Sequence, residues 1–71
     1  MKLIKLDRHN QLPKNINMVE FGKPYYAGTA EIDCVVREFK AHYGYAPKTV
    51  YQVTDMTWNR VVNKYFVVLE E

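Results

Sequence analysis

The sequence predicts a small α+β domain: a mostly antiparallel sheet of about four strands with one long helix packed on one face. The middle of the chain repeats apolar residues with the period of a helix. Both flanks carry short β-branched and aromatic runs that are typical of strands. At 71 residues the chain has room for a single domain, residues 1–71, whose small core leaves its stability marginal.

The long helix is expected over residues 30–43. Apolar residues recur there at i, i+3, i+4, i+7 and i+11 and line one face: Ile32, Val35, Val36, Phe39 and Tyr43. Thr29 is suited to cap the first turn, because its hydroxyl can accept from a free backbone N–H. Gly44 suits the left-handed position that ends many helices.

Two short strands are expected before the helix, over residues 2–6 and 16–21. In the first of them, Ile4 and Leu6 would share one face of the sheet. Residues 9–15 between the strands are rich in turn formers, so the two strands are expected to pair antiparallel. A further turn and an extended approach to the helix are expected at residues 22–24 and 25–27.

Two more strands are expected after the helix. Residues 49–53 are β-branched and aromatic, which favours a strand. Residues 65–69 are apolar without interruption, and such a run indicates a strand buried on both faces at the centre of the sheet. These two strands complete the predicted sheet.

The stretch between them, residues 54–64, is ambiguous. Four apolar residues fit helical spacing and favour a short second helix near residues 55–63: Trp58, Val61, Val62 and Tyr65. A strand over residues 57–62 that turns at Asn63 and Lys64 fits almost as well.

The residue types argue against an enzyme. The chain has no serine, which excludes serine-nucleophile hydrolases, and its three glycines match neither common phosphate-binding loop. One cysteine and two histidines are too few for a closed zinc site, and a lone cysteine forms no internal disulfide. We therefore expect no catalytic residues, no metal and no cofactor.

One set of side chains along the helix nevertheless invites a metal or thiol hypothesis: Cys34, Glu38 and His42, spaced four residues apart. Eight residues of helix rise about 12 Å, so Cys34 and His42 cannot bind one zinc ion together. A reactive thiolate needs a cationic neighbour or a helix N-terminus, whereas Cys34 has Glu38 one turn away. The set is interpreted as a solvated or interfacial helix face.

The chain shows no export or membrane signal. Charges interrupt residues 1–7 before any apolar signal region can form. The longest apolar run, residues 65–69, is far shorter than the ~20 residues that span a bilayer. A cytoplasmic location without membrane contact is expected.

The aromatic content points to binding. Six tyrosines, three phenylalanines and one tryptophan exceed what so small a core needs. Trp, Tyr and Arg dominate protein–protein hot spots, which selects these residues for a partner surface: Trp58, Arg60, Tyr25, Tyr26 and Lys23. The sequence predicts a small non-enzymatic binding or regulatory module that acts through protein–protein contacts with a partner of unknown identity. Self-association as a homodimer is one form of such contact, since small domains gain stability by oligomerising.

The alternative is a nucleic-acid-binding domain. Residues 1–24 carry five cationic and two acidic side chains, and aromatic residues on the strands could stack with bases. The aromatic residues meant are Tyr51, Tyr65 and Phe66, with Tyr25 and Tyr26 near the second turn. No RNA- or DNA-binding motif accompanies them, so this alternative rests on composition alone.

Overall fold

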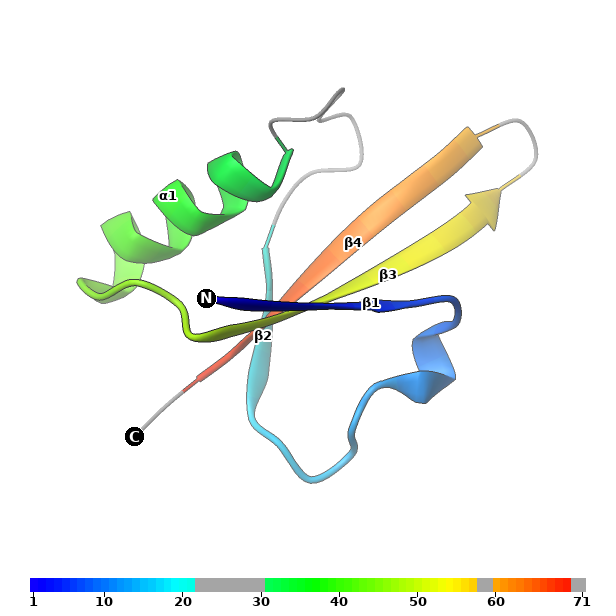
Figure 1. Ribbon diagram of the computed structural model, residues 1–71, viewed down its shortest axis with the longest axis horizontal. Coiled ribbons are helices and arrows are strands. Elements are labelled where there is room, and N and C mark those ends of the chain that lie inside the picture. The colour runs from blue at the N-terminus through cyan, green and yellow to red at the C-terminus, as the bar shows by residue number, and fades with distance from the viewer. Residues whose placement is uncertain (22–30, 58–59, 70–71) are drawn as a thin grey trace.

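The computed structural model describes residues 1–21, 31–57 and 60–69, and Figure 1 shows their arrangement. The elements in chain order are β1 (Lys2–Leu6), the 3₁₀ turn η1 (His9–Gln11), β2 (Met18–Phe21), α1 (Glu31–Tyr43), β3 (Thr49–Thr57) and β4 (Arg60–Val68). The four strands form one sheet in the order β1-β3-β4-β2. Only β1 and β3 pair parallel, so the predicted α+β class with a mostly antiparallel sheet is confirmed.

The strand order confirms one prediction and corrects another. β4 lies between β3 and β2, as its unbroken apolar run indicates. The predicted antiparallel pair of residues 2–6 and 16–21 is wrong, because β1 and β2 lie at opposite edges of the sheet. β3 and β4, the two longest strands, take the centre of the sheet. Residues 7–17 therefore connect one edge to the other instead of forming a tight turn.

The predicted second helix near residues 55–63 is also wrong. The described part of this stretch is strand, and Thr57 pairs with Arg60 across β3 and β4. The turn of the alternative is misplaced as well, since Asn63 and Lys64 lie inside β4. The hydroxyl of Thr54 donates to Oδ1 of Asn63 at 3.0 Å directly across the pair. Long-range pairing of β-branched residues thus overrides an apolar spacing that also fits a helix.

The long helix is confirmed and packs as its pattern predicts. Val35 and Phe39 are fully buried on one face of α1. They contact a core provided by the central strands: Val50, Tyr65 and Val67. The predicted cap Thr29, like the turn at 22–24 and the approach at 25–27, lies outside the described residues.

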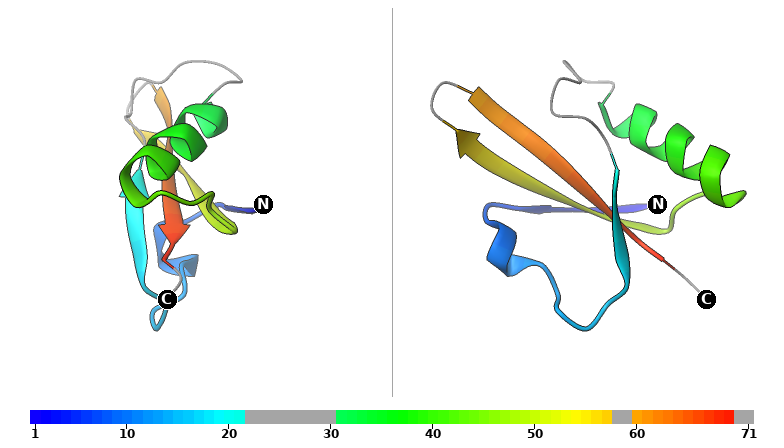
Figure 2. Two further views of the ribbon diagram at one scale, coloured as in Figure 1. Left: turned by 90° about the vertical axis from the view of Figure 1, so that its left-hand side faces the viewer. Right: turned by 180° about the vertical axis from the view of Figure 1, so that it is seen from behind.

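The two faces of the sheet are covered by different parts of the chain. Core residues such as Val67 alternate with Phe66, which faces the opposite side. On that side Val53 is fully buried although it is not part of the core under α1, and η1 packs against β3 there. The helix and η1 lie toward opposite ends of the sheet, as Figures 1 and 2 show.

Gly44 ends the helix in a conformation that only glycine adopts easily. Its φ is +79°, and its N–H donates to the Lys40 carbonyl at 2.9 Å. A Cβ added here would meet no atom within 4 Å, so Gly44→Ala adds backbone strain without a clash. We expect Gly44→Ala to lower the free energy of unfolding by about 1 kcal/mol in urea titrations. Gly44→Asn should lower the free energy of unfolding less than Gly44→Ala does, because asparagine tolerates a positive φ. Equal losses in the two variants would contradict backbone strain as the cause.

Candidate functional site

The two central strands run past their neighbours. β1 pairs with β3 only as far as Val53, and β2 pairs with β4 only from Tyr65 onward. Residues 54–57 and 60–64 therefore pair with each other and, within the described chain, with no further strand. We call these two segments the β3–β4 arm. Figure 1 shows it extending away from α1 and the rest of the sheet.

The arm has no further strand beside it among the described residues, and it exposes apolar surface. Val61 is 60% exposed, a high value for a valine inside a strand. An unpaired strand edge presents a row of backbone N–H and C=O groups that another strand can bind. A two-stranded ribbon is at best marginally stable by itself in water. The arm is thus a segment that contact with a further strand would stabilise.

The predicted partner-binding residues are placed only in part. Arg60 begins β4 at the far end of the arm, where its backbone pairs with Thr57. Trp58 directly follows β3 in the sequence but lies outside the described residues. Tyr25, Tyr26 and Lys23 also lie outside the described residues.

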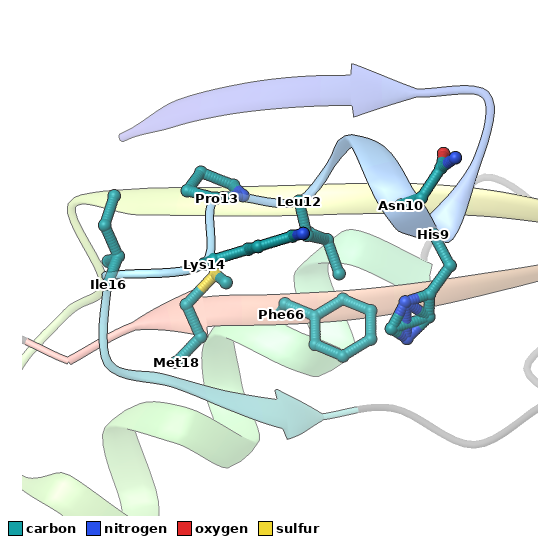
Figure 3. Close-up of a pocket in the computed structure, with 8 residues that line it drawn as sticks. All are labelled: His9, Asn10, Leu12, Pro13, Lys14, Ile16, Met18 and Phe66. Carbon is teal, nitrogen blue, oxygen red and sulfur yellow. The ribbon is translucent and has the colours of Figure 1, made fainter.

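A second surface, which the sequence reading missed, is a hollow of about 460 Å³ on the face of the sheet away from α1. Figure 3 shows it between residues 9–16, which comprise η1 and the loop after it and are called the η1 segment, and strands β2 and β4. Its lining residues are His9, Asn10, Leu12, Pro13, Lys14, Ile16, Met18 and Phe66. The sequence reading treated residues 9–15 as a turn. The apolar Leu12, Pro13 and Ile16 in so polar a stretch were the signal that it covers other apolar residues.

Local hydrogen bonds fix the wall that η1 contributes to this hollow. Oε1 of Gln11 accepts from the backbone N–H groups of Asp7 and Arg8, at 2.9 and 3.1 Å. The turn places the His9 imidazole edge-on to the Phe66 ring, with 5.4 Å between the ring centroids. A side chain from the turn and one from a central strand are thereby held together.

The aromatic residues divide between the two faces. Tyr65 is 4% exposed in the core under α1, so it cannot serve as a stacking surface for bases. Tyr51 and Phe66 pair across β3 and β4 on the other face and are half-buried. Tyr65 is therefore removed from the aromatic residues proposed to stack with bases. Base stacking by the other aromatic residues stays a prediction.

The helix residues considered for metal or thiol chemistry form no group of three possible metal ligands among the described residues. Cys34 is a half-buried free thiol, and the His42 ring lies 5.9 Å from the Phe21 ring, centroid to centroid. Within residues 1–21, 31–57 and 60–69, no three His, Cys, Asp or Glu side chains form a group that could hold a metal ion. No helix in this described part is long and apolar enough to cross a membrane.

Comparison with protein-family models, with curated proteins and with solved structures found no significant match to this chain. The arm and the hollow are therefore the features of the molecule that indicate a function.

Proposed function

We propose that the chain is a small non-enzymatic binding module that makes protein–protein contacts through the β3–β4 arm. One observation carries the proposal: the central strands extend beyond β1 and β2, and no further described strand pairs with residues 54–57 and 60–62. Strand addition to such an edge is a common mode of peptide and protein recognition.

The residue types of the arm support this mode of contact. Backbone groups along its edges supply hydrogen bonds, and the exposed Val61 supplies apolar area. Arg60 at the far end of the arm, and Trp58, which follows β3 in the sequence, are of the types that dominate hot spots. An incoming strand would also convert a marginal two-stranded ribbon into a three-stranded sheet.

A second copy of the chain is the first partner to test, and charge favours one edge for it. Antiparallel pairing of two β4 edges about Val61 would place Arg60 opposite Val62 of the other copy, so no like charges would meet. The β3 edge, residues 54–57, contains Asp55 and no cationic residue, so two β3 edges would bring acidic residues together without a counter-charge. We therefore expect self-association to use the β4 edge of the arm, with the exposed Val61 at its centre.

Sedimentation equilibrium of the purified chain tests this form of the proposal. The weight-average mass is expected to rise with concentration from 8.4 kDa toward twice that value. Val61→Asp should weaken the dimer about tenfold or more, because position 61 would face position 61 of the other copy at the β4 edge. Two carboxylates there would repel each other and lose hydration. Ile16→Asp is the matched control, since Ile16 is a β-branched residue 41% exposed on the other surface.

A chain that stays monomeric at millimolar concentration would exclude the homodimer and leave a different protein as the partner. A photo-reactive side chain, placed at position 61 in one variant and at position 16 in another, then shows which of the two surfaces contacts a partner in cells. Cross-linking to a defined protein from position 61, and not from position 16, would support the arm. Cross-linking from position 16 alone, or from neither, would refute it.

A further inference from the structure

We infer that the hollow beneath η1 binds a small amphipathic carboxylate, with its apolar body inside the hollow and its carboxylate at Lys14. This site lies on a different part of the chain from the β3–β4 arm, so it goes beyond the proposed protein contact and does not depend on it.

The size and the walls of the hollow suit a small apolar body. Its volume of about 460 Å³ falls within the range of small-molecule sites, roughly 300–1,000 Å³. Most of the wall is apolar and is formed by Leu12, Pro13, Ile16, Met18 and Phe66. Figure 3 shows these side chains coming from the η1 segment, from β2 and from β4. Chain segments far apart in sequence therefore converge on one apolar space.

The polar residues of the wall select the charge of the ligand. Lys14 contributes an ammonium group, and His9 and Asn10 contribute groups that can donate hydrogen bonds. No carboxylate is among the lining residues. Glu20, which pairs with Phe66 and is exposed on the same face of the sheet, is not part of the lining. An anionic head group would meet hydrogen-bond donors there, whereas a cationic one would face Lys14.

Contacts within the chain hold the walls of the hollow in place without a ligand. The hydrogen bonds to Gln11 hold the turn, and the His9–Phe66 ring contact fixes one end of the hollow. Ile16 remains 41% exposed at the rim, so apolar surface is available for a ligand to cover. Binding to a site already formed avoids the entropy cost of ordering it.

Competition for the fluorescent dye 8-anilinonaphthalene-1-sulfonate tests this inference. The dye combines an aromatic body with an anion and is expected to bind with saturation. Decanoate should displace it, whereas 1-decanol, which has the same chain without the charge, should displace it less well. Lys14→Gln should weaken decanoate binding about three- to tenfold and leave decanol unchanged. Lys40→Gln, at an exposed lysine on α1, is the control and should change neither.

Three results would overturn the inference: dye binding that does not saturate, equal competition by decanol and decanoate, or equal effects of Lys14→Gln and Lys40→Gln. Displacement by short oligothymidylate but not by decanoate would assign the hollow to nucleic acid instead. Ile16→Asp, which places a carboxylate at the rim, should abolish decanoate binding. Val61→Asp should leave decanoate binding intact, so failure of the arm proposal and failure of this one can be told apart.

Discussion

Phe39→Ala is expected to remove a large part of the free energy of unfolding of the protein. The Phe39 side chain is fully buried, and its ring lies 4.6 to 5.5 Å, centroid to centroid, from three other aromatic rings: those of Phe21, Tyr43 and Tyr45. Removing such a ring costs about 3–5 kcal/mol. The whole free energy of unfolding of a domain this small is roughly 4–11 kcal/mol. Circular dichroism during urea titration measures the loss.

Lys40→Ala is the control for Phe39→Ala because Lys40 is the next residue of the same helix and is exposed. Its loss of unfolding free energy should stay below about 0.5 kcal/mol. Comparable losses in the two variants would mean that α1 does not present the predicted face to the sheet.

Val53→Asp is expected to be as damaging as Phe39→Ala, although Val53 lies outside the core under α1. Val53 is fully buried on the face of the sheet that η1 covers. A carboxylate there would lose its hydration, and Lys64, which lies directly opposite on β4, would offset that loss only in part. The expected cost is about 3 kcal/mol or more. The same urea titration measures this loss.

Val61→Asp is the matched control for Val53→Asp. It introduces the same side chain in place of the same residue type on the adjacent strand, at a position that is 60% exposed. Val61→Asp should lower the free energy of unfolding by less than about 1 kcal/mol. If Val53→Asp were tolerated equally well, residues 7–17 would not cover this face, and the hollow that depends on them would not form.

Local patterns alone determined part of this fold. The helix follows from apolar spacing over residues 31–43, because the contacts that form a helix lie within a few residues of each other. Its end follows from Gly44, whose positive φ the sequence anticipates. The central place of β4 follows from its unbroken apolar run.

The candidate site was predictable only in part. The sequence selected Arg60 and Trp58 by residue type, and the structure places Arg60 on the arm. Exposure of Val61 and the extension of β3 and β4 beyond the described pairing with β1 and β2 depend on tertiary contacts, which composition does not reveal. The hollow escaped prediction because Phe66 and His9, which meet there, are far apart in the chain.

The sequence by itself determined the class of the fold, the long helix with its buried face, and a central last strand. Only the tertiary structure decided that residues 60–63 form a strand and that β1 and β2 lie at opposite edges. The physical reason is the same in both cases. Strand pairing joins residues distant in sequence, and Val61 and Val62 satisfy either a helix or a strand until β3 provides the partner.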